Sequence, residues 1–287
     1  MENNPLLGAH MSIAGGIEKS LLRGYDLGCN TIQIFTKNSR GWREKEFKEP
    51  EIGAFHETKK KTGIDPVISH CSYLINLASP ESEIYRKSIN AMLFETERCE
   101  LLGIAYLVMH PGAHKGSGEL SGIEKIADAI NVLHQKTTEF RVKILLETTA
   151  GQGTNLGYRF EQLAEIIERV EEKSRMGLCL DTCHIFAAGY ELRTKDGYRK
   201  IFKDIEEIIG MERLMVIHIN DSRSDYGSRV DRHEHIGQGL IGEKPFRWIM
   251  NDERFKNIPK IIETPKVGSK DRDNLQLLKS FCNENHP

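Results

Sequence analysis

Histidine, aspartate and glutamate residues stand where short apolar stretches of this sequence end. Such residues terminate six consecutive stretches, and they are His70, His110, Glu147, Asp181, His218 and Glu263. A single histidine at such a position is more often a satisfied core or surface residue than a ligand. Six in a row are harder to explain that way, because random placement would put many of them at stretch starts or within helices. We therefore interpret them as candidate metal ligands.

Two short spacings add three more candidates. In the segment Asp181–His184 a carboxylate and an imidazole stand three positions apart, in the turn that would leave a strand. In Asp231–His233 they stand two apart, so an extended loop would point both to one side. The nine residues are too many for one ion, because zinc takes about four ligands. Five imidazoles and four carboxylates suit two or three Zn²⁺ or Mn²⁺ ions better than Mg²⁺ or Ca²⁺.

Metal ions held this way could hydrolyse a phosphoester. Two ions about 3.5 to 4 Å apart lower the pKa of a shared water and stabilise an in-line displacement. The net charge of −2 argues mildly against a polyanionic substrate. However, four carboxylates against three dications leave a centre of roughly +2. Basic residues after the second and seventh strands should border the same rim and bind phosphates, and these are Lys37, Arg40, Arg43, Arg223, Arg229 and Arg232.

The elements that must position these residues follow from the pattern of apolar stretches. Short apolar runs alternate with longer amphipathic stretches along the whole chain, which predicts alternating strands and helices. The predicted strands are Leu6–Met11, Thr31–Thr36, Pro66–His70, Tyr106–His110, Lys143–Glu147, Met176–Asp181, Leu214–Asn220 and Lys260–Glu263. The clearest predicted helices are Ile17–Leu27, Ser82–Leu102, Ile123–Lys136, Phe160–Lys173 and Tyr198–Ile209, with a last helix beyond Pro265.

This alternation predicts an α/β fold, a single TIM-type (β/α)₈ barrel with the metal site at the C-terminal face of the strands. The competing doubly wound sheet usually carries a glycine-rich phosphate turn after its first strand, which Gly15-Gly16 does not match. The Gly-Gln-Gly turns at Gly151 and Gly237 are weak signals. No linker or low-complexity tract divides the 287 residues, so we predict one domain over residues 1–287.

The composition is typical of a soluble globular protein, with 39% hydrophobic and 29% charged residues and a mean hydropathy of −0.45. No apolar run approaches the roughly 18 residues that span a bilayer. The N-terminus also lacks the basic and then apolar region of a signal peptide. We expect a cytoplasmic protein without membrane association. The six cysteines are scattered without paired spacing and are predicted to be reduced, mostly buried thiols.

Of the six histidines outside the candidate ligand set, five can be assigned from their positions. His56, His134 and His286 lie in predicted helical or terminal segments and are assigned to solvent. His10 ends the first predicted strand and His114 follows a Pro-Gly turn. These two are candidates for contacts behind the ligands or with substrate, not for ligands.

Five motifs of this sequence together resemble the endonuclease IV family of apurinic/apyrimidinic endonucleases. They are GAHMS at 8–12, HCSYLINL at 70–77, ETTAGQG at 147–153, DTCH at 181–184 and VDRH at 230–233. The resemblance runs from about Gly8 to Glu263. It implies a zinc-dependent endonuclease of DNA base excision repair that hydrolyses the phosphodiester 5′ to an abasic site in double-stranded DNA. The products would be a 3′-hydroxyl and a 5′-deoxyribose phosphate, and we expect the enzyme to be a monomer.

The resemblance also implies a trinuclear zinc centre and divides the nine ligands among three ions. The first zinc would be held by His70, His110 and Glu147. The second would be held by Glu147, Asp181, His218 and Glu263. The third would be held by His184, Asp231 and His233. Glu147 would bridge two ions, and Glu147 and Glu263 are the residues to which we assign catalytic roles.

The same resemblance implies that side chains insert into the DNA duplex at the lesion. The matching positions here are Arg40, Tyr73 and Leu74, and Arg232 would contact the DNA beside the third metal. An abasic nucleotide rotates out of the stack cheaply because it has no base to unstack. Without the resemblance, Tyr73 and Leu74 would be interpreted as rim packing. The family often has Gln after the inserting Arg, whereas this chain has Gly41.

Two other functions compete with this interpretation. A metal-dependent sugar isomerase or epimerase on a similar barrel would also carry Glu, Asp and His at its strand ends. It would need only one or two metals and would have no use for the trio His184, Asp231 and His233. A damage-sensing DNA-binding protein with structural zinc fits less well, because structural zinc sites are closed and usually rich in cysteine.

Overall fold

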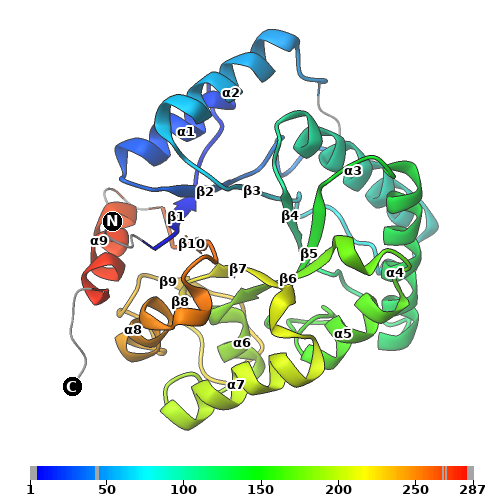
Figure 1. The fold of residues 1–287 in the computed structure, drawn as a ribbon. Coiled ribbons are helices and arrows are strands. Elements are labelled where there is room, and N and C mark those ends of the chain that lie inside the picture. The colour runs from blue at the N-terminus through cyan, green and yellow to red at the C-terminus, as the bar shows by residue number, and fades with distance from the viewer. Residues whose placement is uncertain (1–4, 43–44, 267, 269, 283–287) are drawn as a thin grey trace.

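The computed structural model describes residues 5–42, 45–266, 268 and 270–282, so Arg43 and His286 lie outside the described residues. Its centre is a closed barrel of parallel strands in the spatial order β1-β10-β7-β6-β5-β4-β3-β2 (Figure 1). The strands are β1 (Leu7–His10), β2 (Thr31–Ile34), β3 (Val67–His70), β4 (Tyr106–Met109), β5 (Lys143–Glu147), β6 (Met176–Asp181), β7 (Leu214–His218) and β10 (Lys260–Ile262). The predicted α/β barrel is confirmed, and all eight predicted strands are present.

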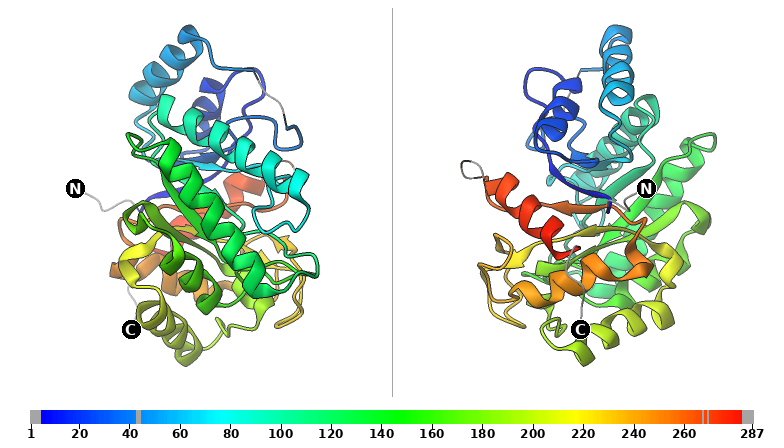
Figure 2. Two further views of the ribbon diagram at one scale, coloured as in Figure 1. Left: turned by 90° about the vertical axis from the view of Figure 1, so that its right-hand side faces the viewer. Right: turned by 60° about the vertical axis from the view of Figure 1, so that its left-hand side comes forward.

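Helices form the outer layer around these strands, as the side views make plain (Figure 2). They are α1 (Glu18–Asp26), α2 (Glu49–Thr62), α3 (Ser82–Leu101), α4 (Glu119–Lys136), α5 (Phe160–Arg169), α7 (Lys195–Ile208), α8 (Glu243–Asn251) and α9 (Lys270–Phe281). Single 3₁₀ turns precede three strands, at η1 (Lys173–Arg175), η2 (Met211–Arg213) and η3 (Glu253–Phe255). The last helix, α9, contacts β1 and β10, so the two ends of the described chain meet at the same side of the barrel.

Two elements on the C-terminal face depart from the simple strand and helix alternation. The short helix α6 (Thr182–Ala188) begins directly after β6, and an antiparallel pair, β8 (Asp221–Ser222) with β9 (His233–Glu234), follows β7. Neither was predicted from the sequence, and the helices α2 and α8 were not among the clearest predicted helices. The pattern of α2 is hard to detect because Phe55 is its only fully buried residue. A helix with so narrow an apolar face shows little periodicity.

The core consists of two apolar layers. One lies between the strands and the helices and holds most of the buried hydrophobic residues. The other is a separate small cluster contributed by six of the barrel strands, and it consists of Ile68, Val108, Leu145, Cys179, Val216 and Ile261. Because side chains alternate between the two faces of a strand, these six fill the barrel interior. Five of the six cysteines are buried and all six are free thiols, as predicted.

Among the described residues, none of the helices combines the length and the apolar character needed to cross a membrane.

Candidate metal centre

Strand alternation places the candidate ligands directly above the apolar cluster inside the barrel. Each residue of that cluster stands two positions before a candidate, so Ile68 precedes His70 and Val216 precedes His218. Residues two apart on a strand share a face. The same step on the other four strands gives His110, Glu147, Asp181 and Glu263. The interior layer of this barrel thus changes from apolar to ligand-bearing at the C-terminal ends of its strands.

The remaining three candidates come from the two extra elements on this face. Asp181 is the N-cap of α6, and its Oδ1 accepts the backbone N–H of His184 at 2.9 Å, which fixes the position of His184 beside the strand end. His233 lies in β9, paired with Ser222 of β8, and Asp231 lies in the loop before it. The two-stranded ribbon and the short helix therefore bring residues distant in sequence to the rim of the barrel.

The structure brings all nine candidates together in three groups of potential ligand atoms. Within each group the atoms lie within 4.8 Å of one another. The groups are His70, His110 and Glu147; Glu147, Asp181, His218 and Glu263; and His184, Asp231 and His233. Donor atoms around one tetrahedral zinc are about 3.3 Å apart, given bond lengths of about 2.0 Å. The sets are those that the resemblance assigned to three ions, and Glu147 belongs to two of them.

Glu147 lies at the centre of the arrangement and is fully buried. Its Oε2 is 2.9 Å from Nε2 of His70 and 3.2 Å from Nε2 of His110. Its Oε1 is 3.1 Å from Nδ1 of His218, which is also 3.1 Å from Oε2 of Glu263. The two oxygens of this carboxylate therefore face two different groups, as a bridging ligand requires.

The third group is more open. Oδ2 of Asp231 is 3.2 Å from Nε2 of His184, and Oδ1 is 3.5 Å from Nε2 of His233. The side chain of Asp231 is 41% exposed and that of His110 is 33% exposed, whereas Glu147 and His218 are inaccessible. Solvent and substrate can therefore reach the first and third groups from the rim.

Four of the five candidate imidazoles are oriented by an oxygen acceptor behind them. His70 donates its Nδ1–H to the carbonyl of Cys71, and His184 donates its Nδ1–H to the carbonyl of Thr148. His233 likewise donates from Nδ1 to the carbonyl of Glu263. A carbonyl oxygen can only accept, so in each ring the Nδ1 carries the proton. The other nitrogen of each ring then has a lone pair that faces the carboxylates.

His218 is held the other way round. Its Nε2–H is 2.8 Å from Oε1 of Gln33, which leaves Nδ1 toward Glu147 and Glu263. A lone pair facing a carboxylate is repulsive unless a proton or a metal ion lies between them. Metal-binding histidines in proteins show this arrangement, one nitrogen on an acceptor and the other on the ion. The donor set therefore fits metal ions.

The electrostatics of the metal-free site agree with this interpretation. Burial lowers the pKa of His184, but Asp181, Asp231 and Glu147 outweigh it and raise the pKa well above its usual range. Burial also lowers the pKa of His218, but Cys179, Glu263 and Glu147 outweigh it and raise that pKa well above its usual range. Burial raises the pKa of Glu147, but the His218 and His110 imidazoles hold it well below its usual range. Burial also opposes ionisation of Asp231, but its histidine neighbours outweigh it and lower the pKa to about 2. The site thus keeps the carboxylates of Glu147 and Asp231 ionised, which is the form that binds a metal ion.

A further group of nearby donor atoms, formed by Asp181, Cys183 and His233, is a poor metal site. Burial raises the pKa of the Cys183 thiol to about 12, so the thiol keeps its proton, and Sγ faces the carbonyl of Arg232. The thiolate is the form of cysteine that binds metal. Asp181 and His233 are thus available to the other groups.

Sequence reasoning missed the residues that support the ligands. Gln33 donates to Oε1 of Glu263 at 2.7 Å and accepts from His218, and it pairs in register with His10 on β1. The amide of Asn220 donates to Oδ2 of Asp181 and its Oδ1 accepts from the backbone of Glu263. The strand step that locates the ligands also locates Gln33, since it lies on β2 and faces the same interior. Asn220 stands two positions after His218, at the end of the predicted strand, and was likewise not identified.

The residues expected to contact DNA lie on the same face. Tyr73 is 63% exposed, and its ring contacts Phe35 edge-on with centroids 5.4 Å apart. Leu74 is half-buried beside it, and Arg40 and Arg232 are at least partly exposed. The Tyr73 ring also lies 5.7 Å from that of His70, so the proposed wedge stands next to the first ligand group.

The predicted basic rim is wrong at one position. Lys37 is 2% exposed and pairs with Glu95, so it does not border the rim as a free cation. Arg223 and Arg229 are exposed, but Arg223 pairs with Glu234 and the Arg229 guanidinium lies over the ring of Tyr158. A basic residue after a strand can be buried or solvated, and no periodicity distinguishes the two cases.

The assignment of His134 to solvent is also wrong. It is 4% exposed on the inner face of α4, and neither ring nitrogen has a hydrogen-bond partner among the described residues. His56 is exposed as predicted. His10 contacts Oε1 of Glu263 and Gln33, behind the second ligand group, while His114 accepts backbone N–H groups of its own loop.

A family model and several known proteins match most of this chain. Residues 23–281 match the family model described as a xylose isomerase-like TIM barrel. A protein of Chloroflexus aurantiacus named probable endonuclease 4 is 52% identical over 279 residues, which cover 96% of this chain and 98% of that protein. A protein of the same name from Geobacter sulfurreducens is 52% identical over 274 residues, covering 96% and 93%.

Solved structures that resemble this chain include one with substantial sequence identity and one that shares little beyond the fold. Endonuclease IV from Thermus thermophilus superposes with a TM-score of 0.87 at 34% identity, over 96% of this chain and 98% of that one. A D-tagatose 3-epimerase-like protein superposes with a TM-score of 0.74 at 16% identity over 96% of both chains. At that identity the epimerase likeness shows a shared barrel and nothing about chemistry.

Proposed function

The chain belongs to the endonuclease IV family, and from that premise we propose that it repairs DNA by hydrolysing the phosphodiester 5′ to an abasic site in double-stranded DNA. The products are a 3′-hydroxyl and a 5′-deoxyribose phosphate. The reaction uses three zinc ions, with Mn²⁺ as the alternative at one or more positions. The enzyme acts as a monomer in the cytoplasm.

One observation carries the metal part of this proposal. Four imidazoles from different segments each donate one N–H to an oxygen behind them and aim the other nitrogen at shared carboxylates. A structural cluster of histidines has no need for such uniform orientation. Because the donors fall into three groups, two of which share Glu147, three ions fit the arrangement better than one or two.

When bound, the ions supply an activated water and positive charge for the developing negative charge on the phosphate. Glu147 and Glu263 would hold the ions in position. Glu147 presents one oxygen to each of two groups, and Glu263 is fixed through both of its oxygens, one toward His218 and one toward Gln33. Water attacks phosphorus, the bond from phosphorus to the 3′-oxygen breaks, and that oxygen takes up a proton as it leaves.

His184, Asp231 and His233 would hold the third ion at the exposed side of the centre, where the scissile phosphate must arrive. Arg232, next to both loop ligands in sequence, is exposed there, and the part of its guanidinium that does not donate to the Asp231 carbonyl can bind a phosphate. Its backbone carbonyl accepts a hydrogen bond from the backbone N–H of Arg223, which keeps this loop against the segment after β8. We assign Arg232 to DNA binding and Arg40, Tyr73 and Leu74 to insertion at the lesion.

A sugar isomerase or epimerase is the rival function, since a protein named for such an activity shares the barrel. The third ligand group and the exposed Tyr73 favour a nuclease, because a small sugar requires neither. Incubation with a range of ketoses and aldoses separates the two. Robust isomerisation without incision of DNA would overturn the proposal.

The direct test combines metal analysis with incision of a duplex that holds one abasic site. We expect about three equivalents of zinc or manganese, one for each ligand group, and a single cut on the 5′ side of the lesion, mapped by end-labelling each strand in turn. Removal of metal by chelation should stop incision while leaving the barrel folded. Unfolding on chelation, without incision by the loaded protein, would favour a structural zinc protein instead.

A further inference from the structure

The two loops assigned to DNA insertion are tied together by one buried ion pair. Nζ of Lys37, after β2, lies 3.4 Å from Oε1 of Glu95 on α3, and both side chains are 1% exposed. Lys37 also donates to the carbonyl of Gly41 at 2.6 Å, next to Arg40. Both carboxylate oxygens of Glu95 accept the backbone N–H of Ser72, next to Tyr73. Each partner of the pair thus holds one loop.

Hydrogen bonds of Ser72 and Arg98 also hold the loop after β2. Ser72 donates its hydroxyl to the carbonyl of Ser39 at 2.9 Å, so the two loops are also joined directly. About one helical turn after Glu95, the guanidinium of Arg98 donates to the carbonyls of Thr36 and Lys45, at the two ends of the first loop. Glu95 and Arg98, both on α3, therefore form hydrogen bonds with backbone groups of the two loops.

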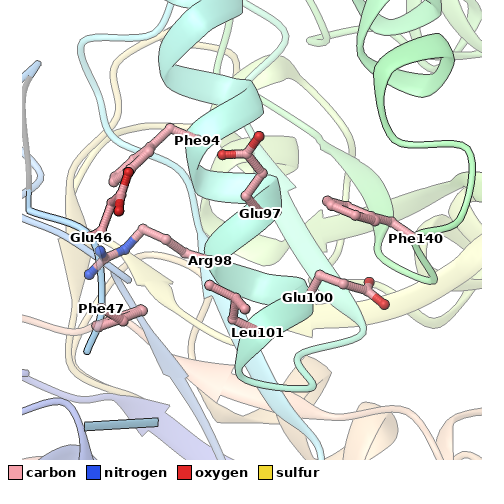
Figure 3. Close-up of a pocket in the computed structure, with 8 residues that line it drawn as sticks. All are labelled: Glu46, Phe47, Phe94, Glu97, Arg98, Glu100, Leu101 and Phe140. Atoms are coloured by element: carbon pink, nitrogen blue, oxygen red, sulfur yellow. The ribbon is translucent and has the colours of Figure 1, made fainter. Parts of the chain in front are cut away.

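Arg98 is itself packed from the outer side. Its guanidinium carbon lies 3.4 Å from the centre of the Phe47 ring, and the side chain forms one wall of a cavity of about 440 Å³ on the flank of the barrel. Figure 3 shows Arg98 reaching from α3 between Phe47 and Glu46. Arg98 thus binds the carbonyls of Thr36 and Lys45, which lie on either side of Arg40 in the sequence.

Burying two charges costs more free energy than an apolar pair of the same size, so such a pair is weak evidence for a role in stability. We therefore look for the role of this ion pair in the groups that its two charges bind. Here they hold backbone groups of two loops on the ligand face, and fixing a binding loop beforehand removes the entropy that ordering would otherwise cost on binding. An insertion wedge needs that fixed position, because it must meet the lesion as a unit.

We infer that Lys37 and Glu95 are positioning residues for lesion recognition, which fix the Arg40 loop and the Tyr73–Leu74 loop in one orientation before DNA binds. This inference rests on the proposed function. Lys37 donates within its own loop and Glu95 accepts from the Tyr73–Leu74 loop, and none of these hydrogen bonds reaches the nine candidate ligands in the part of the chain that the structure describes. Their loss should therefore affect DNA engagement and leave the metal chemistry intact.

The test compares Glu95→Gln with Glu97→Gln, an exposed carboxylate on the same helix. Four quantities are measured on the metal-loaded proteins: metal content, hydrolysis of bis(4-nitrophenyl) phosphate, KM and kcat for incision, and fluorescence of 2-aminopurine placed beside the abasic site. We expect Glu95→Gln to raise KM about tenfold or more and to reduce the fluorescence rise that accompanies loss of base stacking. Metal content and hydrolysis of the small ester should match those of Glu97→Gln.

A second variant, Ser72→Ala, keeps the test decisive if Glu95→Gln does not fold. It removes the hydroxyl bond to Ser39, and we expect a smaller change in KM and fluorescence in the same direction. Wild-type KM and fluorescence in the folded variants would overturn the inference, as would equal losses on DNA and on the small ester. Failure of the proposed function looks different, since the unaltered protein would then cut no abasic duplex.

Discussion

Nε2 of His218 and Oε1 of Gln33 lie 2.8 Å apart, and this contact decides which nitrogen of His218 faces the carboxylates. The amide of Gln33 cannot turn round, because its Nε2 donates to Oε1 of Glu263 at 2.7 Å. One glutamine on β2 therefore orients two candidate ligands, from β7 and from the end of β10. Loss of a residue in this role typically lowers metal affinity about 10- to 100-fold.

Replacement Gln33→Leu should weaken metal binding without unfolding the barrel. The leucine fills a similar volume but supplies neither the acceptor for His218 nor the donor for Glu263. We expect the affinity for the most weakly held ion to fall about 10- to 100-fold, measured by competition with a chromogenic chelator. Ser69→Ala on β3 is the control, because residue 69 faces the opposite side of its strand from His70. Equal affinities in all three proteins would refute the role of Gln33.

Glu263→Gln should abolish incision and leave DNA affinity within a few-fold of the unaltered protein. Oε2 of Glu263 is 3.1 Å from Nδ1 of His218, among the ligand atoms, and not among the exposed arginines expected to meet DNA. The amide removes a negative charge from the centre but keeps its shape. Single-turnover incision and binding in a filter or anisotropy assay measure the two effects. Turnover equal to that of the parent protein would contradict the catalytic assignment.

The strands and the six candidate ligands at their ends could be predicted because both depend on local pattern. An apolar run indicates a strand, and alternation determines which face of the strand each side chain takes. The same alternation places Gln33 in the barrel interior, but glutamine is not a usual ligand for zinc, so its residue type gives no signal. The end of the first predicted strand made His10 a candidate for a contact either behind the ligands or with substrate, and the structure places it against Glu263 and Gln33.

What could not be predicted depends on contacts distant in sequence. The burial of Lys37 requires Glu95 from a helix farther along the chain, and the burial of His134 depends on how α4 packs against the barrel. The ribbon β8–β9 is only two residues per strand and carries no periodicity. It is held by Asp221, whose carboxylate accepts backbone N–H groups of residues that follow β9, and nothing in the sequence indicates those bonds.

His134 should make the protein less stable in mild acid. Burial lowers its pKa to about 4, while the unfolded chain has the usual value of 6.5. As the pH falls through 6.5, the unfolded state gains a proton that the folded state refuses until about pH 4, so stability is lost over that window. Between about pH 7.5 and pH 5 the loss from this group is about 2 kcal/mol.

The variant His134→Leu should remove that part of the pH dependence. The measurement is the free energy of unfolding by urea at several pH values, on metal-free protein so that ligand protonation contributes equally to both chains. His56→Leu, at an exposed histidine, serves as the control and should follow the parent curve. If His134→Leu loses as much stability as the parent over the same pH range, then His134 is protonated or hydrated in the folded protein.

Binding to an abasic duplex should weaken steeply with salt even though the chain has a net charge of −2. Phosphate contacts release counterions from DNA, and the logarithm of the binding constant falls with the logarithm of the salt concentration by about 0.9 per contact. Arg232 lies beside the third ligand group, so Arg232→Ala should reduce the slope by about one. Arg199→Ala is the control, because that side chain is 69% exposed on the outer helix α7 and pairs with Asp196. If Arg232→Ala leaves the slope unchanged, Arg232 does not contact the DNA. If binding of the parent protein does not depend on salt, the predicted basic rim does not bind phosphates.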